Sequence, residues 1–177
     1  MATGGAYAIF LNGPYGVGKT STLDHVGNLL AAGNQPFSLL DVDWFHRSWP
    51  PATFDEDNTI IEARNMASVW SNYQTAGARQ LVVSGVIASR EDLDRYTEAL
   101  AQPVRPIRLV ANDSTIRSRL RSRYGSTRGT ELDWHLQRYG ELQDRMAATN
   151  IDEAVVDTDD RTPREVAQVV LGHFLIA

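Results

Sequence analysis

The sequence predicts an α/β protein with one domain of three layers, in which a five-stranded parallel sheet carries helices on both faces. The first observation is the alternation of short apolar runs with helical stretches, which is typical of parallel sheets. The second is that the first apolar run, Ala6-Tyr7-Ala8-Ile9-Phe10-Leu11, is continuously hydrophobic, as expected of a strand buried on both faces. The third is the length of 177 residues without a repeat or a low-complexity linker, which fits a single domain over 1–177.

Each element of this prediction depends on a local pattern. Strands are expected near 6–11, 37–42, 80–86, 104–110 and 153–157, and helices near 18–32, 59–77, 89–100, 113–123, 133–148 and 162–175. Two helix starts are well marked, because Ser89 with Asp92 forms a capping box and Thr162-Pro163 supplies a cap and a first-turn proline. The buried stripe expected in the second helix is Ile60, Ala63, Ala67, Trp70, Tyr73 and Ala76.

A glycine-rich segment joins the first strand to the first helix. Its sequence, Gly13-Pro14-Tyr15-Gly16-Val17-Gly18-Lys19-Thr20, matches the phosphate-binding loop, or P-loop. Glycines let the backbone amides turn toward phosphates, and the helix N-terminus adds positive partial charge. Lys19, the only lysine in the chain, is expected to act in catalysis on the β- and γ-phosphate oxygens, and the Thr20 hydroxyl to ligate Mg²⁺. ATP and Mg²⁺ are the expected cofactors, with nucleotide contacts from Gly13, Tyr15, Gly16, Val17, Gly18, Lys19, Thr20 and Ser21.

Two aspartates follow the second predicted strand. Asp41 and Asp43, at i and i+2 on a strand, would share one face at the edge where the γ-phosphate lies. Asp43 is expected to accept the proton of an acceptor hydroxyl or to position Mg²⁺, with Asp41 in support, although either can instead cap a turn. The third strand carries no acid, so Mg²⁺ must take its ligands from Asp41, Asp43 or water. Trp44 is expected either to line the acceptor pocket or to pack locally.

Arginines carry the remaining cationic functions. Arg119 and Arg123 share a helix face, and the glycine-containing segment at about 124–132 has the composition of a lid. Arg123 and Arg128 are expected to stabilise transition-state charge, Arg119 to lie near the nucleotide, and Arg138 to contact the acceptor. The alternative is a solvated arginine face that balances the 22 acidic residues. Arg64, near the start of the second helix, can equally bind an anionic substrate or be solvated.

Composition excludes several classes of protein. A net charge of −5 argues against a dedicated nucleic-acid surface, and the absence of cysteine excludes disulfides and thiolate chemistry. No signal peptide and no apolar span of about twenty residues is recognisable, so neither nucleic acid nor membrane is an expected partner and a cytoplasmic location is expected. The expected partner is a small-molecule acceptor with a hydroxyl group. The oligomeric state is not readable.

The chain as a whole resembles the small P-loop kinases that include tunicamycin-resistance protein, chloramphenicol phosphotransferase, gluconate kinase and adenylylsulfate kinase. The resemblance lies in the segments 10–20, 63–65, 119–123, 137–138 and 157–159, together with Tyr73, Gly77, Val166 and Ala167. It is similar to the chloramphenicol phosphotransferase pattern at Val42-Asp43, where the family's aspartate acts as a base. The resemblance implies an ATP-dependent kinase that transfers the γ-phosphoryl group to a hydroxyl of a metabolite or antibiotic. A nucleotide or nucleoside monophosphate kinase, and a P-loop regulatory ATPase or switch, remain as alternatives.

Overall fold

The computed structural model describes residues 6–124 and 129–176, and the side chains of residues 123–137 lie outside the described part. The strands are β1 (Ala8–Asn12), β2 (Phe37–Asp41), β3 (Gln80–Gly85), β4 (Val104–Val110) and β5 (Ala154–Asp157). The helices are α1 (Lys19–Ala32), the 3₁₀ helix η1 (Val42–Trp44), α2 (Thr59–Gln74), α3 (Arg90–Leu100), α4 (Asp113–Tyr124), α5 (Gly129–Thr149) and α6 (Pro163–His173). The predicted α/β class is confirmed.

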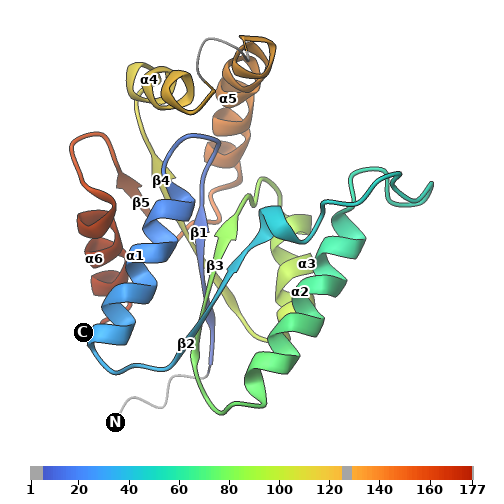
Figure 1. The fold of residues 1–177 in the computed structure, drawn as a ribbon, viewed down its shortest axis with the longest axis vertical. Coiled ribbons are helices and arrows are strands. Elements are labelled where there is room, and N and C mark those ends of the chain that lie inside the picture. Colours follow the sequence, from blue (N-terminus) through green and yellow to red (C-terminus); the bar gives the residue numbers. More distant parts are fainter. Residues whose placement is uncertain (1–5, 125–128, 177) are drawn as a thin grey trace.

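The five strands form one parallel sheet in the order β2-β3-β1-β4-β5. Helices α1 and α6 cover one face and α2 and α3 cover the other, whereas α4 and α5 lie beyond the carboxyl edge of the sheet (Figure 1). The three-layer arrangement predicted from the sequence is therefore confirmed. Because all strands are parallel, their carboxyl ends meet at one edge, and the loops that follow them lie side by side there.

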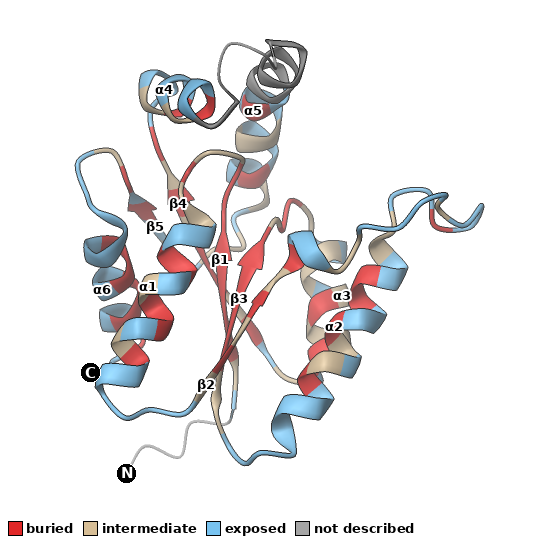
Figure 2. Ribbon diagram, viewed as in Figure 1, coloured by how far each residue is buried: buried red, intermediate tan, exposed pale blue. Residues whose placement is uncertain are grey.

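The central strand β1 divides two hydrophobic cores. Ile9 and Leu11 pack into the core under α1 and α6, whereas Ala8 and Phe10 pack into the core under α2 and α3. All five residues of β1 are buried, as Figure 2 shows for the middle of the sheet. This two-sided burial explains the continuous apolar run in the sequence, because a strand covered on both faces has no solvated side for polar residues. The P-loop thus begins from a strand that is buried along its whole length.

The end of β2 differs from the prediction. The strand stops at Asp41, and Asp43 lies in η1, so the expectation that both carboxylates share one strand face is wrong. The physical reason is a local hydrogen bond, because the Asp43 amide donates to Oδ1 of Asp41 at 3.1 Å. An aspartate that accepts from the amide two residues later turns the chain. Asp41 thus caps η1 and sets the direction in which Asp43 leaves the sheet.

The buried face of α2 also differs from the predicted stripe. Ile60 and Tyr73 are 38% and 42% exposed, whereas Glu62 is 6% exposed and lies on the inner face. The residues of α2 that are buried are Glu62, Ala63, Met66 and Trp70. The predicted cap residues Ser89 and Thr162 are both confirmed by hydrogen bonds to the third residues of their helices. Within residues 6–124 and 129–176, none of the helices has the length and hydrophobicity that crossing a bilayer requires.

Candidate active site

The glycine-rich loop between β1 and α1 adopts a conformation that only glycines allow at several positions. Gly16 and Gly18 have φ angles of 83° and 97°, in the left-handed region. A Cβ atom on Gly13 would lie 2.7 Å from the carbonyl oxygen of Leu109 in β4. The side chain of Asn12 anchors the start of the loop, because its Oδ1 accepts from the amides of Gly13 and Ile87 at 3.0 and 2.8 Å. Asn12 therefore ties the start of the loop to the segment that follows β3.

Lys19, the first residue of α1, arches back over the loop. Its ammonium donates to the carbonyl oxygens of Gly13 at 2.7 Å and Pro14 at 3.1 Å. These contacts place a cation above the concave side of the loop, at the N-terminus of α1. The helix N-terminus and the ammonium together create the positive potential that phosphate oxygens require.

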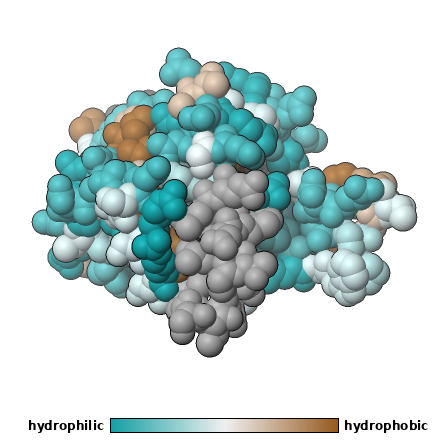
Figure 3. Space-filling view, turned by 90° about the horizontal axis from the view of Figure 1, so that it is seen from above, coloured by the Kyte–Doolittle hydropathy of each residue, from teal (hydrophilic) through white to brown (hydrophobic). Residues whose placement is uncertain are grey.

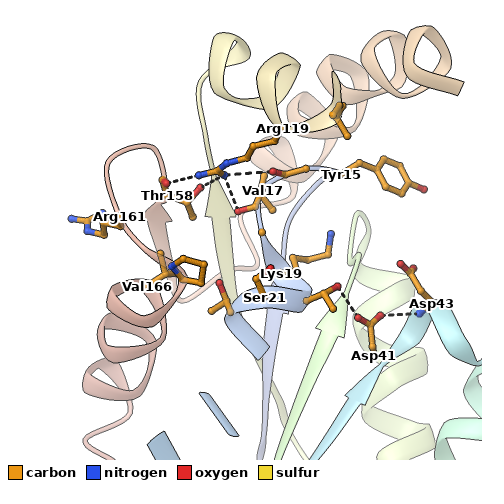
Figure 4. Close-up of a pocket in the computed structure, with 16 residues that line it drawn as sticks. Tyr15, Val17, Lys19, Ser21, Asp41, Asp43, Arg119, Thr158, Arg161 and Val166 are labelled. Atoms are coloured by element: carbon orange, nitrogen blue, oxygen red, sulfur yellow. Dashed lines mark hydrogen bonds between the residues drawn. The ribbon is translucent and has the colours of Figure 1, made fainter. Parts of the chain in front are cut away.

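A hydroxyl and two carboxylates meet beside the loop. The Thr20 hydroxyl donates to Oδ2 of Asp41 at 2.9 Å, while Oδ1 of the same carboxylate accepts from the Asp43 amide. The carboxylate of Asp43 is exposed at this edge. Figure 4 shows Asp41 and Asp43 on the side of the loop opposite the β5–α6 loop. Asp41 thus contacts Thr20 directly, whereas Asp43 lies in η1, further from the P-loop.

These groups line a cavity of about 380 Å³ at the carboxyl edge of the sheet (Figure 4). Its walls come from the P-loop and α1, from the end of β2 and η1, from α4 and from the β5–α6 loop. They comprise Tyr15, Gly16, Val17, Gly18, Lys19, Thr20, Ser21, Thr22, Asp41, Asp43, Arg119, Leu120, Thr158, Arg161, Pro163 and Val166. All the P-loop residues expected to bind nucleotide except Gly13 line this cavity, and so does Arg119.

Arg119 on α4 joins the P-loop to the loop after β5. Its guanidinium donates to the hydroxyl and carbonyl oxygens of Thr158 at 3.0 and 2.8 Å, and to the Val17 carbonyl at 3.3 Å. A neighbouring contact, in which the Asn112 amide donates to the Asp159 carboxylate at 3.0 Å, holds the loop between β4 and α4 to the loop after β5. The Arg119 guanidinium is therefore fixed by three acceptors on two loops, a set that the ammonium of a lysine does not match in geometry.

A second cavity of about 360 Å³ adjoins the first through Tyr15, which lines both. Its other lining residues are Asp57, Val86, Arg138, Glu141, Leu142 and Arg145. Tyr139 fixes α5 beside it, because its hydroxyl donates to the Ala111 carbonyl at 2.9 Å, and burial raises the pKa of Tyr139 to about 12. Figure 3 views the molecule from this edge and shows a largely hydrophilic surface around the residues that are not described.

The structure brings only some of the predicted acceptor residues together. Arg138 lines the second cavity, as just described. Trp44 is 72% exposed and lines neither cavity, and Arg64 lines a separate groove between α2 and α3. Residues 125–128 of the predicted lid at 124–132, with Arg128 among them, lie outside the described residues. The side chains of Arg123 and of the rest of the lid are also not described.

The donor set beside the P-loop fits Mg²⁺. Thr20 and Asp41 offer a hydroxyl and a carboxylate, which are hard oxygen ligands, and they lie in direct contact. Among the described residues no group of three or more His, Cys, Asp or Glu side chains is arranged to hold a metal ion. Mg²⁺ keeps several waters and binds through one or two protein ligands plus substrate phosphates, so a small donor set is what it requires.

Sequence reasoning missed a buried polar network next to this site. Glu62 on α2 accepts from the Tyr96 hydroxyl of α3 and lies 2.8 Å from Nδ1 of His46, which follows η1. Burial and the adjacent Glu62 carboxylate raise the pKa of Tyr96 far above its usual range. Nothing local in the sequence marks Glu62, because its partners are 16 and 34 residues away. Thr158 and Asn12 were likewise missed.

Several solved structures have the same fold, and some of them are kinases by name. They include tunicamycin resistance protein from Deinococcus radiodurans, with 17% identity, 98% of each chain covered and a TM-score of 0.64. Shikimate kinase from Acinetobacter baumannii in complex with shikimate is 20% identical, with 96% of this chain and 93% of that chain covered and a TM-score of 0.59. A gluconokinase from Sinorhizobium meliloti is 20% identical, with 97% and 91% covered and a TM-score of 0.61.

At these identities the likeness establishes the fold, and the predicted P-loop kinase fold is confirmed. No protein-family model matches the sequence, and no curated protein matches it.

Proposed function

We propose that this protein is an ATP-dependent kinase that transfers the γ-phosphoryl group to a hydroxyl of a small molecule. The observation that carries the proposal is the hydrogen bond from Thr20 to Asp41, which brings the end of β2 against the P-loop. In this proposal Asp41 would lie at the metal side of the phosphate site, and Asp43 would serve the acceptor side. The kinases among the solved structures of the same fold support this function.

The nucleotide phosphates would lie in the first cavity. The loop amides of residues 16–20 and the Lys19 ammonium would bind the β- and γ-phosphates, and Arg119 would border the nucleotide from α4. Thr20, with Asp41 next to it, would hold Mg²⁺, which when bound neutralises charge on the phosphate oxygens. The positive groups are already positioned by hydrogen bonds of the protein itself, so little reorganisation is needed when ATP binds.

Asp43 would act as the base in the transfer step. The acceptor oxygen forms a bond to the γ-phosphorus, its proton passes to the Asp43 carboxylate, and the bond from the γ-phosphorus to the bridging oxygen breaks to release ADP. Lys19 balances the negative charge that develops on the transferred group. Arg123, at the end of α4, and Arg128, on the predicted lid, are proposed to add positive charge to the phosphate site.

The second cavity supports an acceptor that is rich in hydroxyl groups. Its charged side chains are two arginines, Arg138 and Arg145, and two acids, Asp57 and Glu141. A site for a phosphate group concentrates cations, whereas a mixture of carboxylates and guanidinium groups suits hydroxyls, which donate to the acids and accept from the arginines. A metabolite or antibiotic with several hydroxyls is therefore favoured over a nucleoside monophosphate. Trp44 and Arg64 are proposed to contact only an acceptor that extends beyond this cavity.

The function is tested by measuring ADP release from Mg-ATP with and without acceptors. The acceptor panel contains sugar acids, cyclic polyols, glycoside antibiotics and nucleoside monophosphates, and ³¹P NMR identifies the phosphorylated product. We expect slow turnover without acceptor and a phosphate monoester with one hydroxylated acceptor class. A diphosphate product from a nucleoside monophosphate supports the nucleotide kinase alternative. Rapid hydrolysis that no acceptor changes supports a regulatory ATPase.

A further inference from the structure

Glu62 is a buried carboxylate that the proposed reaction does not use. Its side chain is 9% exposed, although it lies in the first turn of α2, where an exposed acid would suffice to complement the helix N-terminus. Burying a carboxylate is costly unless its oxygens are hydrogen-bonded. Each oxygen has a partner, since Oε1 accepts from the Tyr96 hydroxyl and Oε2 faces Nδ1 of His46 at 2.8 Å. The cost of burial is thus offset by two contacts to different elements.

The contact with His46 reaches residues 42–47, the segment that carries Asp43. His46 follows η1 by two residues. Among the hydrogen bonds of the described residues, the Asp41 cap is the only one that anchors this segment on the sheet side. On the other side the segment is held to α2 twice, by His46 to Glu62 and by Asn65, whose Nδ2 donates to the Phe45 carbonyl at 2.9 Å. Within the segment, Arg47 Nε donates to the Asp43 carbonyl at 2.9 Å.

We propose that Glu62 is a positioning residue that holds Asp43 at the acceptor side of the phosphate site, acting through His46. The proposal rests on the kinase function and on the role of Asp43 given above. Tyr96 on α3 satisfies the carboxylate oxygen that faces away from His46, and the other oxygen fixes the imidazole. The imidazole in turn limits where η1 can lie, so the base is held between the Asp41 cap and α2. A mobile Asp43 would lose the alignment with the acceptor on which its contribution depends.

The groups around Glu62 define what each substitution removes. The groups that face the carboxylate are His46 from the loop, Tyr96 and Arg95 from α3, with Asp92 paired to Arg95 at 2.7 Å. A glutamine at this position keeps a carbonyl oxygen that accepts from Nδ1–H of His46, and its amide group can donate to the Tyr96 oxygen. Glu62→Gln should therefore preserve the link to His46, whereas Glu62→Leu removes it.

The kinetic test compares Glu62→Gln, Glu62→Leu, His46→Ala and the double variant Glu62→Leu/His46→Ala, with the acceptor identified in the panel above. We expect Glu62→Leu and His46→Ala each to lower kcat about tenfold or more, with KM for Mg-ATP within about twofold of wild type. The double variant should lose no more than the worse single variant, because both changes break one link. Additive losses, or an unchanged kcat in both single variants, would overturn the proposal.

Glu62→Gln supplies a test that does not depend on tolerance of leucine at a buried site. This variant should retain most of the wild-type kcat, because it keeps the hydrogen bond to His46. A kcat as low as that of His46→Ala would contradict the role of this hydrogen bond. Tyr96→Phe is the matched control, because it removes a hydrogen bond to Glu62 but leaves the link to His46 intact.

An activity-independent measurement separates this proposal from the kinase function. Trp44 is adjacent to Asp43 in η1, so ¹⁹F NMR of protein labelled with 5-fluorotryptophan reports on the segment directly. His46→Ala and Glu62→Leu should shift or broaden the Trp44 resonance and leave that of buried Trp70 in place, whereas Tyr96→Phe should change neither. An unchanged Trp44 resonance in His46→Ala would refute the positional link. The Trp44 changes in a protein that transfers no phosphate would support the link and refute the kinase function.

Discussion

The hydroxyl of Thr20 donates a hydrogen bond of 2.9 Å to the carboxylate of Asp41, at the point where α1 begins and β2 ends. This contact assigns different positions to the two aspartates that the sequence presents as a pair. Asp41 faces the P-loop hydroxyl, whereas Asp43 extends from η1 at the outer rim of the same cavity. We therefore propose that Asp41, more than Asp43, supports the metal, and that Asp43 is left to act on the acceptor.

The two aspartates should be separable by kinetics. Asp43→Asn is expected to lower kcat by about a hundredfold or more, the usual size of a general-base contribution, with little change in KM for Mg-ATP. Asp41→Asn is expected to raise the Mg²⁺ concentration that gives half-maximal rate by about tenfold, because it removes the negative charge next to Thr20. Titrations with Mg²⁺ at fixed ATP measure both effects. Near-normal turnover of Asp43→Asn would remove this residue from the mechanism.

The elements that the sequence predicted well are those whose signals are local. The P-loop combines three glycines, a lysine and a threonine in eight residues, and its conformation depends on those residues and on the adjacent strand. The five strands are apolar runs whose two-sided burial follows from the parallel arrangement. Helix boundaries agreed where a cap was present, as at Thr162.

What the sequence could not reveal depends on contacts between distant residues. The strand β2 ends one residue early because Asp41 caps η1, and the same carboxylate is oriented by Thr20, 21 residues before it. Glu62 is buried because His46 and Tyr96 surround it, which shifts the buried face of α2 from the predicted one, although Ala63 and Trp70 belong to both. Ile60 and Tyr73 are consequently exposed. Helical periodicity records hydrophobicity alone, so a buried acid with tertiary partners is invisible to it.

The bridge made by Arg119 predicts a selective loss of nucleotide affinity. Arg119→Ala removes the hydrogen bonds to Val17 and Thr158, so the P-loop and the β5–α6 loop lose their common anchor. We expect the Kd for Mg-ATP, measured by calorimetry, to rise about tenfold or more, since one charge-assisted contact is worth about 1.5 to 3 kcal/mol. Arg121→Ala, at an exposed position on the same helix, is the control and should bind normally. If both variants raise the Kd for Mg-ATP equally, the loss of one positive charge accounts for the effect, and the bridge made by Arg119 does not.

The close approach of Gly13 to β4 predicts a large loss of stability on adding one methyl group. In Gly13→Ala the Cβ atom would lie 2.7 Å from the Leu109 carbonyl oxygen, and backbone on both sides leaves little freedom to move. We expect the free energy of unfolding to fall by about 2 kcal/mol or more, measured by urea denaturation. Gly140→Ala, on an exposed turn of α5 with open space around the new Cβ, should instead gain about 0.5 to 1 kcal/mol. Similar values for both variants would contradict the predicted clash.

The ion pair between Arg105 and Glu153 predicts part of the acid dependence of stability. Hydrogen bonds of 2.7 and 2.8 Å from Arg105 lower the pKa of Glu153 below its usual value of 4.5, with a further contribution from His173. A carboxyl whose folded pKa is lowered stabilises the protein above its unfolded pKa, and this contribution is lost as the pH falls through the folded pKa. The thermal stability of Glu153→Gln should therefore be lower than wild type near pH 7, and the difference should shrink below about pH 4.5.

The control for this measurement is Glu56→Gln, in the exposed loop before α2. It should follow the wild-type curve across the same pH range. If the difference between Glu153→Gln and wild type stays constant from pH 7 to pH 3, the ion pair does not account for the lowered pKa.

The most direct measurement of the central claim, that the loop around Lys19 holds nucleotide phosphates, uses the composition of the chain. An amine-reactive reagent has two targets, the α-amino group and Lys19, because the other sixteen cationic side chains are arginines. Mass spectrometry can follow acylation of each amine in the unmodified protein. We predict that saturating Mg-ATP suppresses acylation of Lys19 about tenfold or more while the α-amino group reacts as before, because bound phosphates shield the ammonium and keep it protonated. Equal labelling of Lys19 with and without Mg-ATP would contradict the nucleotide site and the kinase function with it.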